Sequence, residues 1–365
     1  MTIFYDHQTF SLQNFGGISR YIVELIKGIN KVSDHKAFLS LAISNNIHLR
    51  EAELSVNSFA SQLKFLQKQS LVYRINQQMC KFDLSTKKYD IIHATYFDPY
   101  FLPYLKGKPF VITFHDMIFE KLGSQFRELG SGTILIRQKK ELAEKANRII
   151  AVSESTKKDI VKLLNIDPAK IDVVYHGSSF TPRIIKKPIK INPYLLFVGN
   201  RGHYKNFLGF LQAVATLLSK HNLKLICAGG GPFTIDERSV IQELGISDRV
   251  KQQYIKSDEM LQALYESALA FIFPSLYEGF GIPILEAFAC GCPCVLSNTS
   301  SLPEIAGEAA LYFDPTSHTS IAQVIERIIT NPDLRIDLTK KGTNRLSFFS
   351  WNQTINRTLD VYSRC

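Results

Sequence analysis

The stretch LAFIFPSLYEGFGIPILEAFACG, residues 269–291, decides the fold because it reads as a strand, a tight loop and a helix in direct succession. It begins with a short hydrophobic run, which is typical of a strand buried on both faces of a parallel sheet. Gly279 and Gly281 allow the backbone to turn sharply. Pro283 suits the first helical position and Gly291 the position just past the helix end. The stretch therefore predicts an α/β protein.

The same alternation of strand-like and helix-period runs continues over almost the whole chain. It predicts two doubly wound α/β domains in series, residues 1–177 and 194–349. Residues 178–193 are rich in proline and lysine and are predicted to be the linker, and residues 350–365 to form a helix that packs back on the first domain. The strand-like runs lie at 2–6, 89–96, 109–116, 147–155, 171–177, 194–200, 223–231, 249–255, 269–275 and 293–298.

The composition fits a water-soluble enzyme, since 45% of the 365 residues are hydrophobic and 21% are charged. The sequence contains neither a signal-peptide pattern nor an apolar run of membrane-spanning length, so we expect a cytoplasmic protein. Six cysteines are few for this length. Cys290, Cys292 and Cys294 lack the spacing of a metal site, and we interpret them as buried residues at alternating positions of a strand.

The positive charge is confined to the first half of the chain. Residues 1–190 contain 28 Lys and Arg against 17 Asp and Glu, whereas residues 191–365 contain 15 against 16. A net charge of +11 in the first half indicates a surface that faces a polyanion. The charge alone would allow nucleic acid, but no RNP pattern or zinc finger is present and we do not expect it; an anionic membrane surface or a phosphorylated lipid is at least as good a partner. A solvated basic surface without a partner is the alternative.

The loops that follow strands are the candidates for a binding site, because ligands of such sheets bind at the carboxyl ends of the strands. A helix that starts near Pro283 would aim its N–H groups at an anion such as phosphate. Glu286 could accept hydrogen bonds from two ribose hydroxyls, and Glu278 could reach the reacting part of the ligand. The alternative for these two acids is a helix-capping residue and an exposed glutamate.

Three further loops carry candidate residues. Arg201 and Lys205 follow the strand at 194–200 and could neutralise a diphosphate. Gly16 and Gly17 precede the helix at 18–29 and could form a backbone anion site. His115 ends a strand and could hydrogen-bond a substrate hydroxyl or relay a proton. Taken singly, each could also be an ordinary surface or loop residue. The sequence contains no D-x-D motif, so a metal clamp on the phosphates is not indicated.

Residues 274–315, PSLYEGFGIPILEAFACGCPCVLSNTSSLPEIAGEAALYFDP, resemble the signature of retaining glycosyltransferases of family 4. The spacing of Glu278 and Glu286 matches the E-x7-E motif of that family. The segments GGISRYI, TFHD, AVSESTKKDI and VVYHG extend the resemblance over nearly the entire chain, with residues 35–85 the least recognisable. The resemblance implies the GT-B fold, in which two Rossmann-like domains face a central cleft.

The resemblance also implies roles for the candidate residues. Glu286 would hold the ribose of a nucleotide-sugar and Glu278 would lie near its sugar. Lys205 and Arg201 would bind the diphosphate, although in many members the arginine directly follows the glycine, where this chain has Asn200. His115 would touch the sugar or the attacking hydroxyl. The donor-binding residues would be Gly16, Gly17, Glu286 and the turn Gly279, Phe280, Gly281 and Ile282. No metal or other cofactor is expected.

The chain also resembles bacterial mannosyltransferases of O-antigen and capsule assembly, through FYDHQTF…GGISRY and FVGNRGHYKN. This resemblance implies transfer of mannose from GDP-mannose to a glycan or lipid-linked saccharide, with the enzyme peripheral on the inner face of the cytoplasmic membrane. A transferase that uses a UDP-sugar such as UDP-glucose or UDP-GlcNAc is the first alternative. A nucleotide-sugar epimerase, a phosphorylase, a non-catalytic basic scaffold and an NAD-dependent oxidoreductase are the others, and CAGGGPF lacks the glycine spacing of the last.

Overall fold

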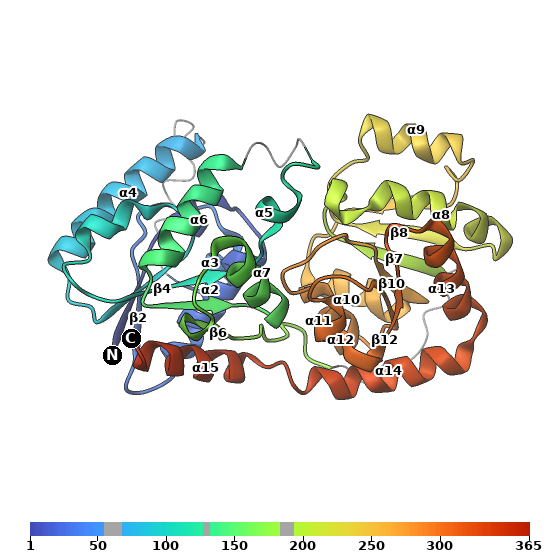
Figure 1. Cartoon of the computed structure of the whole chain (residues 1–365). Coiled ribbons are helices and arrows are strands. Elements are labelled where there is room, and N and C mark those ends of the chain that lie inside the picture. Colours follow the sequence, from blue (N-terminus) through green and yellow to red (C-terminus); the bar gives the residue numbers. More distant parts are fainter. Residues whose placement is uncertain (55–67, 127–131, 183–192) are drawn as a thin grey trace. The chain divides into compact units, whose positions relative to one another are not determined.

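The computed structural model describes residues 1–54, 68–126, 132–182 and 193–365, and these residues form two compact units. Unit 1 consists of Met1–Gly177 together with Trp351–Cys365, and unit 2 consists of Ser178–Ser350. Most of the predicted linker, residues 183–192, lies outside the described residues. Each unit contains one parallel β-sheet with helices around it (Figure 1).

The sheet of unit 1 has six strands in the order β2-β1-β3-β4-β5-β6, and all neighbouring strands pair in parallel. The central strands are buried along their whole length, as β3 and β4 show. The elements are β1 Thr2–Tyr5, α1 Gln8–Leu12, α2 Gly17–Ile29, β2 Lys36–Leu39, α3 Ile47–Glu51, α4 Gln69–Thr86, β3 Ile91–Ala94, β4 Phe110–Phe114, α5 Ile118–Leu122, α6 Thr133–Lys145, β5 Arg148–Ala151, α7 Glu154–Leu164, β6 Ile171–Val173 and α15 Trp351–Ser363.

The sheet of unit 2 repeats this design with the order β12-β11-β10-β7-β8-β9, again parallel throughout. The elements are β7 Tyr194–Val198, α8 Phe207–Lys220, β8 Lys224–Ala228, α9 Ile235–Glu243, β9 Val250–Gln253, α10 Asp258–Ser267, β10 Ala270–Phe273, α11 Ile282–Ala289, β11 Cys294–Ser297, α12 Leu302–Ala306, β12 Ala310–Phe313, α13 His318–Thr330 and α14 Pro332–Leu346. Two doubly wound parallel sheets confirm the predicted α/β class.

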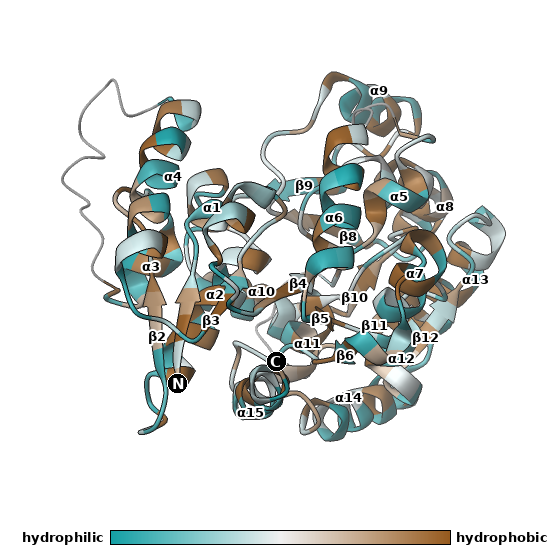
Figure 2. Cartoon of the chain, turned by 60° about the vertical axis from the view of Figure 1, so that its left-hand side comes forward, coloured by the Kyte–Doolittle hydropathy of each residue, from teal (hydrophilic) through white to brown (hydrophobic). Residues whose placement is uncertain are grey.

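Burial of apolar faces holds these layers together. Figure 2 shows hydrophobic residues concentrated on the strands and hydrophilic residues on the outer faces of helices such as α4. The core of unit 2 includes Phe197 and Phe207, whose rings meet edge-on with centroids 5.1 Å apart. In both units the central strands are short and largely hydrophobic, as parallel strands covered by helices on both faces require, whereas edge strands such as β9 carry polar residues.

Helix α15 completes the core of unit 1, although it follows all of unit 2 in the sequence. Its Tyr362 hydroxyl lies 2.8 Å from the Tyr5 hydroxyl and 2.5 Å from His93 Nδ1, all buried. The Thr354 hydroxyl donates to the Tyr175 carbonyl oxygen at 2.8 Å. Since Ile355 and Val361 are buried as well, the helix is part of the hydrophobic interior of unit 1.

The cysteine run is buried, but only one of its members lies on a strand. Cys290 follows the last residue of α11, Cys292 precedes β11 and Cys294 begins β11. The predicted pattern of three alternating strand positions is therefore wrong, because a helix end and a turn fall within the run. All three are free thiols, and burial raises the pKa of Cys292 and Cys294. They behave as small hydrophobic residues.

Candidate active site

The structure places the predicted site residues on both units, in each case after the carboxyl end of a strand. Unit 1 carries Gly16 and Gly17 at the start of α2, and His115 directly after β4. Unit 2 carries Arg201 and Lys205 after β7, and the residues from Glu278 to Glu286 after β10. The topology of parallel sheets makes these edges the places where ligands bind.

The turn that precedes α11 requires glycine at its last position. Gly281 is the N-cap residue and has a φ of 101°, a conformation that side chains rarely adopt. An added Cβ would also lie 3.0 Å from Ile284 Cδ1 and 3.1 Å from Leu302 Cδ2. No side chain caps the helix start, and Pro283 occupies its first turn. The turn therefore directs backbone N–H groups and the positive end of the helix dipole outward.

Two serines that the sequence reasoning missed hold this turn in place. The Ser300 hydroxyl accepts a hydrogen bond from the Glu278 N–H at 2.9 Å. The Ser301 hydroxyl lies 2.9 Å from the Glu278 carbonyl oxygen and 3.0 Å from that of Phe280. Both serines follow β11, the parallel neighbour of β10. The polar run NTSS after that strand was the available signal.

Lys205 and Glu278 form an ion pair with Nζ 2.5 Å from Oε1. Only 15% of the Lys205 side chain and 14% of the Glu278 side chain are exposed, so the pair is largely shielded from water. Burial alone would lower the pKa of Lys205, but the Glu278 carboxylate outweighs it and the pKa is raised. Tyr204, which also hydrogen-bonds the Lys205 side chain, raises the pKa of Lys205 further, so Lys205 is a permanent cation at neutral pH.

Glu286 is held by a tyrosine from the neighbouring helix. The Tyr265 hydroxyl of α10 donates to Glu286 Oε2 at 3.0 Å, and Tyr265 is fully buried. Glu286 itself is only 8% exposed. Burial raises the pKa of Tyr265, and the Glu286 carboxylate raises it further, so the phenol remains a donor at all physiological pH values. Tyr265 therefore fixes one oxygen of the carboxylate.

Arg201 lies in a buried network that binds the loop after β8. Its Nε donates to Glu237 Oε1 at 2.8 Å, and its side chain is 3% exposed. Its terminal nitrogens donate to the carbonyl oxygens of Gly229, Gly230, Gly231 and Pro232 at 3.0, 3.3, 2.9 and 3.0 Å. The charge of Arg201 is thus compensated within the protein, and its contacts shape the glycine-rich loop. A role on a diphosphate remains a prediction.

Glycine is also needed where α2 of unit 1 begins. Gly16 is the N-cap of α2 with a φ of 157°, and a Cβ there would lie 2.8 Å from Gln13 Oε1. No side chain caps this helix, while the Ser19 hydroxyl donates to the Gly16 carbonyl oxygen at 3.0 Å. The start of α2, which follows α1 through a short loop, is therefore a second place with uncapped helical N–H groups.

His115 lies among aromatic rings rather than in an ion pair. Its ring meets Tyr21 edge-on, with centroids 5.2 Å apart, and stacks parallel to His176 at 5.9 Å. Burial lowers the pKa of His115 to about 3, with His93 and Lys139 contributing in the same direction. The imidazole is therefore neutral at physiological pH. A neutral imidazole can accept a proton or hydrogen bond at one nitrogen and donate at the other.

A buried lysine supports the backbone next to His115. Lys139 of α6 is 1% exposed and donates to the Asp116 carbonyl oxygen at 3.0 Å. It also donates to Glu120 Oε2 at 3.1 Å. Asp116 Oδ1 accepts from the Ile118 N–H at 3.0 Å and so begins α5. This cluster was not predictable from the sequence, because Lys139 lies in a run of charges typical of a protein surface.

The local chemistry of unit 2 suits an anionic ligand with hydroxyl groups on either side. One buried ammonium and one uncapped helix start provide positive potential, and two carboxylates flank them. Among the described residues, no group of three or more His, Cys, Asp and Glu side chains is placed to hold a metal ion. In the same residues, every helix is too short or too polar to span a membrane.

Comparison with known families shows that the chain is a glycosyltransferase. Residues 15–179 match the model described as glycosyltransferase family 4, and residues 182–345 match that of glycosyl transferases group 1. The two matches together account for nearly all of both units, and the chain belongs to this family.

Individual relatives of the chain are glycosyltransferases as well. The chain is 28% identical over 368 residues to O-antigen chain mannosyltransferase B of Escherichia coli, covering 95% of each chain. It is 31% identical over 190 residues to O-antigen chain mannosyltransferase RfbU of Salmonella typhimurium, covering 52% of this chain and 53% of that one. The solved structure of sucrose-phosphate synthase from Thermosynechococcus elongatus superposes with a TM-score of 0.75 at 19% identity, covering 100% and 98%. The GT-B fold is thereby confirmed.

Proposed function

We propose that this glycosyltransferase transfers mannose from GDP-mannose, with retention of configuration and without a metal ion, to a hydroxyl of a glycan or lipid-linked saccharide. The observation that carries the choice of sugar is the likeness to an O-antigen chain mannosyltransferase over 95% of both chains. The relative's name gives the sugar and the type of polymer, and we extend both to this chain as a hypothesis.

The ion pair of Lys205 and Glu278 supports a charge-neutralising role at the donor. In this proposal the Lys205 ammonium binds the diphosphate while it keeps its ion pair with Glu278. The uncapped start of α11 adds backbone N–H groups and the helix dipole to the same anion. As the bond to the sugar breaks, negative charge grows on the leaving phosphate. Pre-positioned cations stabilise that charge without a metal.

Glu286 is assigned to the ribose. Tyr265 fixes Oε2 of this carboxylate at 3.0 Å, so Glu286 can present a defined pair of acceptor sites to two neighbouring hydroxyls. Glu278 would contact the transferred sugar through the oxygen that does not bind Lys205. His115, neutral at physiological pH, would hydrogen-bond a hydroxyl of the sugar or the acceptor.

Retention is proposed to occur by front-face displacement. The acceptor oxygen would attack on the face from which the diphosphate departs, and the departing phosphate oxygen would take the acceptor proton. In this mechanism the protein contributes mainly orientation and electrostatic stabilisation of the leaving group. Lys205 would supply the stabilisation, and Glu278 and His115 the orientation.

Unit 1 is proposed to rest on an anionic membrane surface that carries the acceptor. The support is the net charge of +11 over residues 1–190. Sedimentation with liposomes tests this directly. We expect more protein to sediment with vesicles that contain phosphatidylglycerol than with phosphatidylcholine alone, and less at high salt. Equal sedimentation with both vesicles would remove this part of the proposal.

The donor is tested by thermal shift with GDP, UDP, GDP-mannose, UDP-glucose and NAD, each in EDTA. A ligand that binds the folded state raises the melting temperature according to its concentration relative to its Kd. Stabilisation by GDP and GDP-mannose alone would support the proposal. Stabilisation by the two uridine compounds alone would replace the donor with a UDP-sugar and leave the enzyme class unchanged. Transfer to a mannoside acceptor in EDTA, followed by NMR of the anomeric linkage, then tests metal independence and retention.

A further inference from the structure

A groove on unit 1 lies where α2 and α15 run side by side. It is a cavity of about 300 Å³, lined by residues from both helices. This volume is at the lower end of the range for small-molecule sites. The groove includes Lys31, which lies fourteen residues along the chain from Gly17, where α2 begins. At a rise of 1.5 Å per residue, the end of α2 at Ile29, two residues before Lys31, lies about 18 Å from the helix start assigned to the donor.

The floor of the groove is a fixed part of the core. An added Cβ at Gly28 would lie 1.9 Å from Ile355 Cδ1, so the two helices touch at this point. Ile355 is buried in the core of unit 1. Since any larger residue at position 28 would separate the helices, the groove is set by close helix packing rather than by mobile surface side chains.

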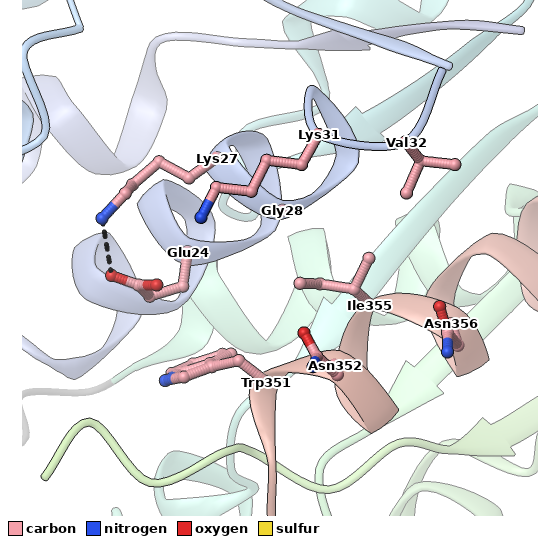
Figure 3. Close-up of a pocket in the computed structure, with 9 residues that line it drawn as sticks. All are labelled: Glu24, Lys27, Gly28, Lys31, Val32, Trp351, Asn352, Ile355 and Asn356. Carbon is pink, nitrogen blue, oxygen red and sulfur yellow. Dashed lines mark ion pairs between the residues drawn. The ribbon is translucent and has the colours of Figure 1, made fainter. Parts of the chain in front are cut away.

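Polar side chains of both helices face one another across the groove. Figure 3 shows Glu24 and Lys27 on α2, and Lys31 in the turn just after it, opposite Asn352 and Asn356 on α15. Lys27 Nζ lies 3.6 Å from Glu24 Oε1, whereas Lys31 forms no ion pair with any residue that the structure describes. The lining thus offers ammonium, carboxylate and amide groups together.

Trp351 supplies an aromatic wall to the same groove (Figure 3). It is the single tryptophan of the chain. Its Nε1 is buried and has no hydrogen-bond partner among the described residues. An indole has a large apolar face and one polar donor, a combination suited to ligands that are apolar on one side and polar at the rim.

We propose that this groove is a second saccharide-binding site, which holds a hexose unit of the acceptor glycan. The C–H face of a pyranose ring would pack on Trp351. Its hydroxyls, which both donate and accept, would pair with Glu24, Lys31 and Asn352. A simple anion would use Lys27 and Lys31 but has no apolar face to pack on Trp351. The choice of a glycan as the source of the hexose rests on the proposed function.

The single tryptophan makes a direct binding measurement possible. We expect a saturable change in Trp351 fluorescence when the protein is titrated with α-linked mannotetraose in the absence of donor, and no change with inorganic phosphate. In Glu24→Ala and in Asn352→Ala the apparent Kd should rise about tenfold, as expected for the loss of one good hydrogen bond. Lys340→Ala, at an exposed lysine of unit 2, serves as the matched control and should leave the titration unchanged.

Three results would overturn the proposal. They are the lack of any change with mannotetraose, a change with phosphate but not with the saccharide, and a change that persists unaltered in both groove variants. The last would mean that the saccharide binds elsewhere and affects Trp351 only indirectly. Melting temperatures of the variants establish that they are folded.

Activity with two acceptors separates this inference from the proposed function. With a monomannoside acceptor, the groove variants should retain the wild-type KM, whereas with a mannotetraose acceptor their KM should rise about tenfold. An active enzyme whose variants show equal KM changes for both acceptors would refute the groove and leave the transferase intact. A protein that binds the saccharide in the groove but transfers no mannose would support the groove and refute the proposed function.

Discussion

Replacement of Tyr265 by phenylalanine isolates the contribution of one hydroxyl to nucleotide binding. The hydroxyl is the 3.0 Å donor to Glu286 Oε2, and both residues are buried. Phenylalanine fills the same space, so the packing of the ring against Phe271 is kept. The variant therefore releases the carboxylate without opening a cavity.

Two different free energies should change. The free energy of unfolding should fall by about 1.5–3 kcal/mol, the typical contribution of a hydrogen bond to a charged group. Nucleotide binding should weaken by only about 0.5–1.5 kcal/mol, because the ligand must now immobilise a side chain that Tyr265 held beforehand. This corresponds to a Kd for the nucleoside diphosphate that rises roughly 2- to 13-fold.

The assay is calorimetric titration of wild type and Tyr265→Phe with the nucleoside diphosphate that binds best and with its 2′,3′-dideoxy analogue. If Glu286 binds the ribose hydroxyls, the substitution should weaken the natural nucleotide and leave the dideoxy compound unaffected, as in a double-mutant cycle. Tyr254→Phe, at an exposed tyrosine of the same unit, is the control. Equal weakening of both nucleotides would refute the reasoning and indicate general loosening of the site.

Three further predictions concern other parts of the molecule. Glu278→Gln should abolish transfer. It should leave GDP binding as tight as in wild type or tighter, because Lys205 no longer pairs with a carboxylate. Full activity of this variant would contradict the role assigned to Glu278. Arg201→Ala should lower the free energy of unfolding of unit 2, measured in urea, by about 3–5 kcal/mol, because it leaves the Glu237 carboxylate buried without its cation. A loss of nucleotide affinity at unchanged stability would instead favour a diphosphate contact. Burial lowers the pKa of His7 and His93 to about 3, so below pH 6.5 the unfolded chain takes up protons that the folded chain does not. The contribution of these histidines to the free energy of unfolding should therefore be full above pH 6.5 and fall by about 2 kcal/mol per histidine at pH 5. Asp6, whose pKa burial raises to about 6, should offset part of this loss. Melting temperatures that stay level between pH 8 and pH 5 would argue against this.

The sequence was sufficient for the parallel sheets and for the backbone of the turn before α11. Strand burial on both faces produces continuous hydrophobic runs, and β3, β4, β7 and β10 all fall within runs predicted as strands. Gly281 was identifiable because its φ of 101° requires a residue without a Cβ. Such features depend on neighbours along the chain, which a sequence displays directly.

The partners of the site residues were not predictable, because they are distant in sequence. Tyr265 is 21 residues from Glu286, and Glu237 is 36 residues from Arg201. An arginine near a glycine suggests an anion site, and only the packing of α9 against the loop after β8 reveals its buried carboxylate. Strand β2 and helix α4 were missed for another reason, since residues 35–85 have weak periodicity and few strong turn signals.

The placement of α15 has a consequence for how the chain is made. A ribosome releases the sheet of unit 1 first, then all of unit 2, and only afterwards residues 351–363, which complete the first core. Until then Tyr5 and His93 have no Tyr362 to bind, and the hydrophobic surface that Ile355 and Val361 cover is open to solvent. During synthesis the nascent first unit is therefore a natural client for chaperones, and unit 2 becomes the first part of the chain able to fold to completion.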